Sequence, residues 1–404
     1  MPLDLNQIAA QVESAAAQLK LDEKGRAERL EHALRTVQAQ EANLDALKAK
    51  TQRSKTTWLV ADLMEGLGRS YAPPPCPTDF TVVAADGSHI DVDREQPVAC
   101  YLINIGTALL RYGSVPDAHL SSSPTLYAGE EHMAIHDPAS ANRQELEGAL
   151  LGVKRTVCEA EALAQLAEGL PSDQPALALL DGSLILWGLA GREIDDYVRE
   201  ELLQKGFLKA LDKMEDAGQS KRLALASYIS FPRSTDVVNA LRVALCPHEP
   251  VDCDRFCNPK VRPAGERPCD AVSGVLDRDL FETLLEPGQR SATFVSPSKI
   301  VQNHYGPHQV QFFYLRVEDE IARVEIPQWV GENRQLLDLA HALIVDQCRR
   351  GFGYPVTLTE AHERAVLSEA DRQQFWHLVN AALAENRLPA NGSAKSRSKR
   401  IRWI

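Results

Sequence analysis

The stretch Phe80–Ser88, FTVVAADGS, decides the fold, and Ala176–Ser183, ALALLDGS, repeats its pattern. In both, an apolar run of the β type leads into Asp-Gly-Ser, at Asp86 and at Asp181. We expect a strand to end at each aspartate, where the following glycine lets backbone or a ligand come close. The two aspartates can converge only if their strands are neighbours. A converged pair commonly holds Mg²⁺ or Mn²⁺ acting on a phosphodiester, although two Asp-Gly turns would give the same letters.

Composition places the chain among ordinary globular proteins, with 404 residues, 44% hydrophobic and 25% charged. Met1–Lys20 lacks the basic start and apolar core of a signal peptide, and no apolar run is long enough to cross a bilayer. We therefore expect a cytoplasmic protein without membrane contact. The net charge of −12 argues against a general nucleic-acid coat but allows a local basic groove. Residues 389–404 are expected to form a basic flexible tail that contacts phosphates or a partner.

The pattern of apolar residues predicts the order of elements after residue 78. The predicted spans are strands Phe80–Asp86, Val98–Ile105 and Leu120–His136, helix Asn142–Glu168, strand Ala176–Asp181, helix Glu193–Ala217, strand Arg222–Ser227 and helix Asp236–Leu245. This order fits an RNase H-like α/β domain, in which a mixed sheet is flanked by helices on both faces. The first and fourth strands are adjacent in that fold, which would place Asp86 beside Asp181.

The two ends of the chain are predicted to be helical. Leu3–Ala49 carries a helix-period apolar stripe, a second helix is expected at Ser54–Leu67, and Tyr71–Pro77 (YAPPPCP) breaks helical structure. We interpret residues 1–70 as a helical arm that packs on its own body or on a dimer or partner interface. Residues 78–388 would form the main domain, including a hairpin over 309–326, a helix at Asn333–Arg350 and a last helix, to about residue 386, behind a capping box at Ser368.

Four of the eight cysteines cluster in a loop insertion over about residues 246–270. They are Cys246, Cys253, Cys257 and Cys269. Four thiols in one loop can hold Zn²⁺ or an iron–sulfur cluster, but the spacing C-x6-C-x3-C-x11-C fits no standard finger. Free thiols in an intracellular insertion are the competing interpretation.

Three motifs, taken in order, resemble the NurA nucleases of DNA end processing. They are the strand that leads into Asp86, the LLDGSL sequence around Asp181, and YPVTLTEAH at residues 354–362. Tyr228–Arg242 (YISFPRSTDVVNALR) is also similar to the family's segment after the second aspartate. The resemblance extends over roughly residues 80–379 and is interrupted by the cysteine loop.

This resemblance implies a site in which two Asp and one Glu bind Mn²⁺ or Mg²⁺, assisted by a Tyr and a His. Position by position, it implies Asp86 and Asp181 as metal ligands, Tyr354 as a group that orients a phosphate or water, and His362 as a ligand or proton carrier. The third carboxylate lies on the helix before the second aspartate. Glu159 and Glu161 are the candidates, on faces about 200° apart. We select Glu159, because it shares a face with Leu163 and Leu166, four and seven positions later.

The resemblance further implies a homodimer that binds DNA ends and single strands beside a hexameric HerA-type ATPase. Arg233, in a loop after a strand, and Arg242 are candidate DNA contacts, although exposed cations are commonly solvated. The expected function is a metal-dependent DNA nuclease, with 5′–3′ exonuclease and single-strand endonuclease activity, in double-strand-break resection. Two alternatives remain: an inactive RNase H-like scaffold or DNA-end-binding protein, and an RNA nuclease or other phosphotransferase on the same fold. No P-loop occurs, so this chain is not expected to be the ATP motor.

Overall fold

The computed structural model describes residues 5–93, 95–96, 98–257 and 265–388. Its contacts divide the chain into two compact units. Unit 1 comprises Met1–Pro73, Ser230–Ser298 and Gln311–Val324, and unit 2 comprises Pro74–Ile229, Lys299–Val310 and Glu325–Ile404. The fold is mixed α/β, with a large sheet flanked by helices. Within the described residues, no helix is long and apolar enough to cross a membrane.

The sheet of unit 2 has the predicted RNase H-like topology. Its strands are β3 (Phe80–Ile90), β4 (Cys100–Tyr112), β5 (Asp117–Ala128), β8 (Ala176–Asp181) and β9 (Leu223–Ile229). They lie in the order β5-β4-β3-β8-β9, in which β4 is antiparallel to both neighbours and the β3–β8 and β8–β9 pairs are parallel. The first and fourth strands of this unit are therefore adjacent, as the sequence predicted.

The register of β3 against β8 sets the two aspartates side by side. The pairing runs from Thr81 opposite Ala176 to Ala85 opposite Leu180. Asp86 and Asp181 are the next residues on the two strands. The apolar runs that precede them are buried, as expected for strands covered on both faces. The sheet thus delivers both carboxylates to one place.

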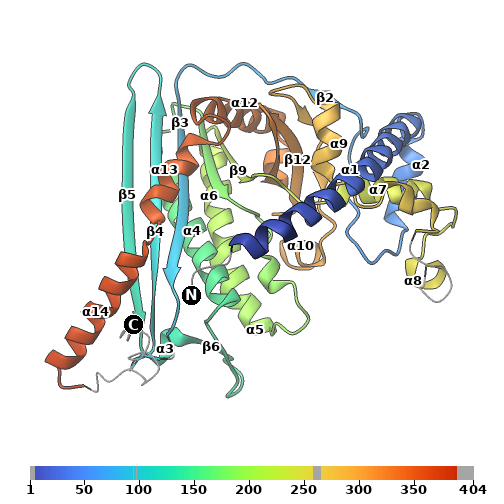
Figure 1. Ribbon diagram of the computed structural model, residues 1–404. Helices are drawn as coiled ribbons and strands as arrows, with labels where there is room; N and C mark the ends of the chain where they lie inside the picture. Colours follow the sequence, from blue (N-terminus) through green and yellow to red (C-terminus); the bar gives the residue numbers. More distant parts are fainter. Residues whose placement is uncertain (1–4, 94, 97, 258–264, 389–404) are drawn as a thin grey trace. The chain divides into compact units, whose positions relative to one another are not determined.

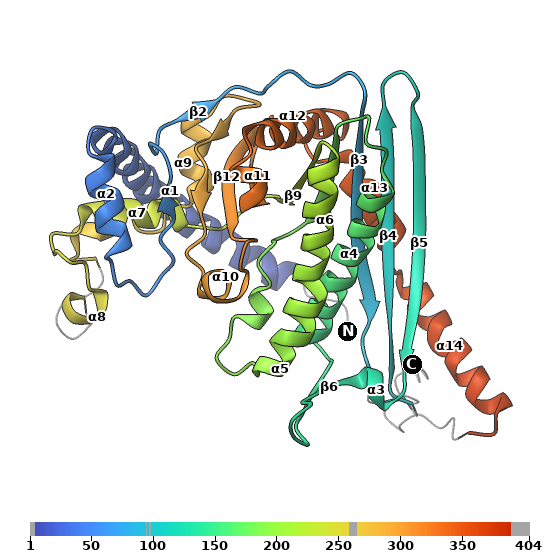
Figure 2. The ribbon, with the colours of Figure 1, turned by 180° about the vertical axis from the view of Figure 1, so that it is seen from behind.

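Helices cover both faces of this sheet (Figures 1 and 2). One face carries α4 (Ala149–Gly169) and α6 (Lys209–Ser220), and the other carries α12 (Arg334–Arg350) and α13 (Val356–Ala365). The predicted last helix is α14 (Glu369–Glu385), and its capping box at Ser368 is present. A residue at the β3–β8 seam can therefore meet α4 on one side and α13 on the other.

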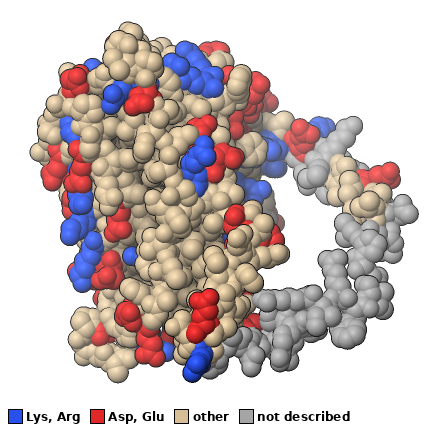
Figure 3. All heavy atoms as spheres, turned by 90° about the vertical axis from the view of Figure 1, so that its left-hand side faces the viewer, with Lys and Arg blue, Asp and Glu red and all other residues tan. Residues whose placement is uncertain are grey.

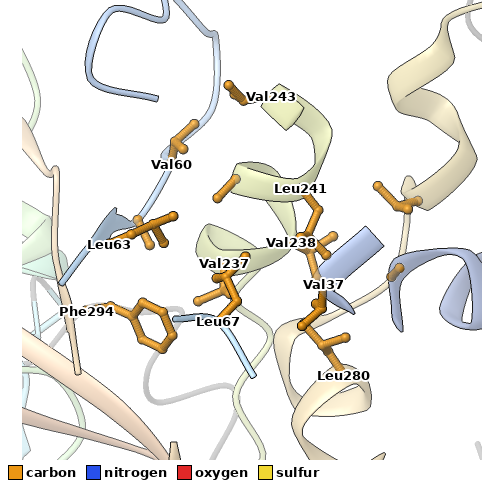
Figure 4. Close-up of a cluster of buried hydrophobic side chains, with 14 of the residues drawn as sticks. Val37, Val60, Leu63, Leu67, Val237, Val238, Leu241, Val243, Leu280 and Phe294 are labelled. Atoms are coloured by element: carbon orange, nitrogen blue, oxygen red, sulfur yellow. The ribbon is translucent and has the colours of Figure 1, made fainter. Parts of the chain in front are cut away.

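Unit 1 packs the N-terminal helices against the middle of the chain. Helices α1 (Leu5–Glu41) and α2 (Leu44–Gln52) lie with α7 (Asp236–Leu245) and α9 (Asp277–Leu284). Figure 4 shows Val37 of α1 beside Val238 and Leu241 of α7 and Leu280 of α9 in one buried cluster. The part of the apolar stripe from Leu30 to Leu47 thus packs on its own chain, whereas Leu5 and Val12 of α1 are exposed.

The remaining elements are short or lie in the C-terminal half. They are β1 (Asp62–Leu63), β2 (Ser70–Tyr71), α3 (Glu130–Met133), β6 (Ala134–His136), β7 (Arg143–Glu145), η1 (Trp187–Leu189), α5 (Asp196–Arg199), the π-helical η2 (Glu200–Leu208), α8 (Cys253–Phe256), η3 (Pro268–Val272), β10 (Arg290–Ser291), β11 (Phe294–Val295), α10 (Lys299–His304), β12 (Val310–Val317), β13 (Glu320–Pro327) and α11 (Gln328–Gly331). The predicted hairpin corresponds to β12 and β13. The predicted tail, 389–404, lies outside the described residues.

The predicted helix Ser54–Leu67 is wrong. Its backbone makes long-range pairings instead: Lys55 bridges Asp252, the Ala61 N–H donates to the Asp236 carbonyl, and β1 pairs with β11. Several boundaries also differ, and β4 continues to Tyr112, beyond the predicted end at Ile105. β3 continues to Ile90 because it stays paired with β4, the predicted third strand ends at Ala128, and α4 begins only at Ala149, after Gly148 with φ +55°.

Candidate active site

The two aspartates occupy different backbone settings. Asp181 is the last residue of β8, and Gly182 follows with φ +85°, a conformation that favours glycine. Asp86 instead lies inside β3, and its Oδ1 accepts the N–H of Gly87 at 2.8 Å. The prediction that a strand ends at each aspartate therefore holds only for Asp181.

Glu159 on α4 faces the same cavity as both aspartates. Asp86, Glu159 and Asp181 line an open cavity of about 410 Å³ together with residues of α4 and η1. The Glu159 side chain is 7% exposed. Glu161, the alternative considered from the sequence, is exposed and lines a different cavity with Tyr127. The structure thus brings Glu159, and not Glu161, together with the aspartates.

The glycine after Asp86 is what lets α4 come close. A Cβ at position 87 would stand 2.7 Å from Glu159 Oε1 and 2.9 Å from the Arg155 side chain. Because real Cβ atoms do not approach that closely, a side chain at this position would displace both groups. In β3, Gly87 is required for space rather than for a turn.

Gly87→Ala is therefore expected to move the Glu159 carboxylate while keeping the fold. We expect divalent-metal affinity to fall about 10- to 100-fold, as it does when a group that positions a ligand is lost. Calorimetric titration with Mn²⁺ measures this. Gly169→Ala is the control, since a Cβ there meets nothing within 4 Å. Unchanged Mn²⁺ affinity in Gly87→Ala would contradict the spacing argument.

Helix α13 brings His362 to the other side of Asp86. His362 Nδ1 lies 2.7 Å from Asp86 Oδ2, and the histidine side chain is 60% exposed. The helix is held on the sheet by its last carbonyls: the Ser88 hydroxyl donates to Ala365 O, and the Asn104 amide donates to Arg364 O and Ala365 O. The carboxylate bond at Nδ1 leaves Nε2 as the ring nitrogen for a substrate or metal.

Tyr354 reaches the second aspartate. Its hydroxyl donates to Asp181, and burial together with the charge of Asp181 raises the tyrosine pKa. The ring packs edge-on against Tyr228 of β9, with centroids 5.3 Å apart. Tyr354 therefore stays protonated at neutral pH and fixes the direction of the Asp181 carboxylate.

Burial and neighbouring negative charge raise the pKa of both Glu159 and Asp181. Burial raises the pKa of Glu159 to about 8, the Arg155 guanidinium opposes this, and the charges of Asp86 and Asp181 add to it. The pKa of Asp181 is also raised, first by desolvation and then by Asp86, against the hydrogen bond from Tyr354. Proton uptake by Glu159 is thus favoured first by its burial and then by the two neighbouring negative charges.

This raised pKa predicts that the metal-free protein loses stability as pH rises. The folded state binds a proton on Glu159 that the unfolded chain releases near pH 4.5, so the stabilisation is full below that pH and is lost as pH rises through about 8. Glu159→Gln should remove this dependence, which amounts to at most about 5 kcal/mol. Denaturant unfolding from pH 4.5 to 8.5 measures it. Glu161→Gln is the matched control, and identical profiles for the wild type and Glu159→Gln would contradict the assignment.

The donor set suits a hard divalent cation. Glu159 Oε1 is buried and accepts no hydrogen bond, although Arg155 Nε lies 3.0 Å away without hydrogen-bond alignment. A buried carboxylate oxygen without an aligned hydrogen bond, in a cavity that two further carboxylates line, fits Mg²⁺ or Mn²⁺. The side chains are not gathered into a finished coordination set, since no group of three or more His, Cys, Asp or Glu in the described ranges is arranged to hold a metal ion.

Ser183 has a structural role in the turn after Asp181. Its hydroxyl donates to the buried Glu325 carboxylate at 2.7 Å, and the Leu184 N–H donates to the same Oε2 at 2.9 Å. Ser88 is likewise engaged, with the Ala365 carbonyl. Ser183 also accepts the Ile185 N–H, as turn-capping residues do, whereas Ser88 lies inside β3 and links this strand to α13.

The other candidate residues lie in unit 1. Arg233 is exposed, whereas the Arg242 guanidinium lies over the Trp58 ring and 3.9 Å from Asp270. Among the clustered cysteines, burial raises the pKa of Cys253 to about 11, with the three other thiols contributing. These four thiols are free and near one another. Their arrangement, within the described part of the loop, is not that of a metal site.

Sequence reasoning missed two groups that line the carboxylate cavity, Arg155 and Trp187. Arg155 is one helical turn before Glu159, and that i, i+4 spacing was available as a signal. Trp187 follows Asp181 by six residues, inside an apolar run that reads as core. Nothing in the local pattern separates it from its buried neighbours.

A model of the NurA domain matches residues 80–367. The chain belongs to the NurA family. The resemblance seen in the motifs is thereby confirmed, and membership implies a nuclease. No curated protein matches the chain.

Solved structures give only distant likenesses. A type 1 RNase H with the type 2 active-site motif is similar at 11% identity and a TM-score of 0.21, covering 41% of this chain and 71% of that one. The C-terminal lobe of a budding yeast Argonaute is similar at 9% identity and a TM-score of 0.18, covering 72% and 51%.

Proposed function

We propose that this NurA protein is a divalent-metal-dependent DNA nuclease that degrades strands from the 5′ end and cuts single strands. The observation that carries the proposal is the convergence of Asp86, Glu159 and Asp181 on one cavity. His362 is bonded to the first of these carboxylates and Tyr354 to the last. A carboxylate cluster flanked by a histidine and a protonated tyrosine suits phosphodiester hydrolysis.

In this proposal Asp86, Glu159 and Asp181 hold Mn²⁺ or Mg²⁺, with His362 as a further ligand or proton carrier. When bound, the metal polarises the phosphodiester and lowers the pKa of a coordinated water. Glu159 must release its proton for binding, because a carboxylate ligand is deprotonated. Arg155 neutralises part of the negative charge of Glu159. Its guanidinium would also donate hydrogen bonds to the phosphate of the substrate.

Two side chains prepare the site before substrate arrives. Asp86 holds the His362 ring by Nδ1, so that a proton can be accepted or donated at the exposed Nε2. Tyr354 holds Asp181 in one orientation and, with its raised pKa, remains a hydrogen-bond donor. The same hydroxyl is the group that we expect to orient a phosphate or water.

We further propose that the protein acts in resection of double-strand-break ends, as a homodimer beside a hexameric HerA-type ATPase. Family membership supports this, and so does the absence of a P-loop in this chain. Arg233 remains a candidate DNA contact because it is exposed, and Arg242 would have to leave Trp58 to act as one. On the face in Figure 3, basic and acidic side chains alternate around a largely uncharged centre, so a DNA path would lie on another surface.

The proposal is tested by incubating the wild type with 5′-labelled and 3′-labelled single-stranded and duplex DNA, and with RNA of the same sequence. We expect Mn²⁺ or Mg²⁺ to support DNA cleavage that EDTA stops, with the end labels giving the polarity. Cleavage of RNA alone would favour the RNA-nuclease alternative. An inert protein with both metals, even with the ATPase partner added, would favour a binding or scaffold role.

A further inference from the structure

A large aromatic side chain stands exposed at the carboxylate cavity. Trp187 is 46% exposed and lines the same cavity as Asp86, Glu159 and Asp181. A tryptophan exposes a broad apolar surface, which favours a partner. Because Trp187 lies beside the proposed reaction centre, its partner should be part of the nucleic-acid substrate bound there.

The segment that carries Trp187 is firmly held, so its exposure is not that of a loose loop. Leu186, directly before it, and Leu189, two residues after it, are buried, and the Leu186 N–H donates to the Tyr305 hydroxyl at 2.8 Å. Gly188 lies against α4 so closely that a Cβ there would stand 2.7 Å from Val153 Cγ2. The residues around Trp187 are therefore tightly packed, whereas the indole itself is exposed to solvent.

Among the residues that the structure describes, the indole has no stacking partner. Trp58 is covered by the Arg242 guanidinium and Trp376 packs edge-on against Phe375, whereas no ring or guanidinium in the described ranges pairs with Trp187. Of the six α4 residues that line its cavity, three are small, Ala149, Gly152 and Thr156, and the others are Val153, Arg155 and Glu159. A Cβ added at Gly152 would meet nothing within 4 Å. The cavity thus combines an unpaired ring with space for a flat group.

We propose that Trp187 stacks on an unpaired base of the strand whose phosphate lies at the carboxylates. An indole stacks readily on any base, but only when the base is free of its duplex neighbours. Trp187 would therefore bind single-stranded nucleic acid without reading its sequence. This stacking role presupposes the nuclease function proposed above and assigns the residue that makes the site prefer a single strand.

The test is a coupling measurement in the Asp181→Asn background, where the bound strand is not expected to be cut. Binding of a single-stranded oligodeoxynucleotide is compared with binding of oligonucleotides that carry one abasic nucleotide at successive positions. We expect Trp187→Ala to weaken binding of the intact strand about tenfold and Trp187→Phe to restore most of it. At one position, removing the base should weaken binding by the protein that retains Trp187 about tenfold as well. At that position the Trp187→Ala variant should lose no further affinity.

Two results would overturn the stacking role. One is unchanged binding of the intact strand by Trp187→Ala. The other is a Trp187→Ala loss that is the same at every abasic position, since a purely structural residue would give that result. Leu126→Ala on β5, another exposed apolar side chain, is the control. Because binding is measured without turnover, a wild type that fails to cleave would refute the nuclease proposal and leave this coupling measurable.

Discussion

Asp181→Asn is expected to lower Mn²⁺-dependent DNA cleavage about a thousandfold, equivalent to about 4 kcal/mol of transition-state stabilisation. The substitution keeps the shape of the side chain and an oxygen that can accept the Tyr354 hydroxyl, but it removes the charge that holds a cation. It also removes one of the charges that raise the pKa of Glu159. The melting temperature of the metal-free variant should therefore not fall. Single-turnover cleavage and thermal unfolding measure the two effects.

The matched control is Asp117→Asn on β5, an exposed aspartate that does not line the cavity. It should cleave as the wild type does. An Asp181→Asn protein that retains more than about a tenth of wild-type activity would remove Asp181 from the site. A variant that unfolds would instead show that the carboxylate supports the fold, contrary to its raised pKa.

Gly106→Ala is expected to lower the free energy of unfolding by about 3 kcal/mol. Gly106 is opposite Asp86 on β4, and a Cβ there would stand 2.2 Å from the Ala361 carbonyl oxygen and 2.4 Å from the Ala365 nitrogen. Both are backbone atoms of α13, so the whole helix must move. The movement would separate His362 from Asp86, and cleavage should fall with stability. Denaturant unfolding measures the loss.

Gly169→Ala again serves as the control. It should be neutral or slightly stabilising, because alanine is favoured over glycine in a helix and its Cβ would meet nothing within 4 Å. His362→Ala separates the loss of cleavage from the loss of stability that Gly106→Ala is expected to cause together. It should lower cleavage while leaving stability nearly unchanged, since His362 is largely exposed. Wild-type stability in Gly106→Ala would show that α13 does not approach β4 as closely as described.

The sequence predicts elements whose signals are local. Helix α7 begins and ends where its apolar period does, and α14 begins at the Ser368 capping box. The helix expected at Ser54–Leu67 fails because its backbone pairs with residues almost two hundred positions away, which no local pattern encodes. β3 extends beyond Asp86 for the same reason, since β4 continues to pair with it.

The candidate site also contains residues that local sequence signals predict and residues that depend on contacts with distant elements. Asp86 and Asp181 could be paired from the sequence, because strand order fixes their adjacency once the fold class is known. Glu159 could be chosen over Glu161 by helix geometry. Gly106 and Trp187 could not be singled out, because their importance comes from the distance to another element. Gly106 permits a helix to approach, and the exposure of Trp187, between the buried Leu186 and Leu189, depends on how its segment packs.

The central claim is that Asp86, Glu159 and Asp181 together hold a divalent cation. Electron paramagnetic resonance of Mn²⁺, titrated into the wild type, Asp86→Asn, Glu159→Gln and Asp181→Asn at pH 8.5, tests it most directly, because bound Mn²⁺ loses the signal of the free ion. We predict tight binding by the wild type and a loss of at least about tenfold in affinity in each variant. Binding that is absent in the wild type, or equal in all four proteins, would contradict the claim.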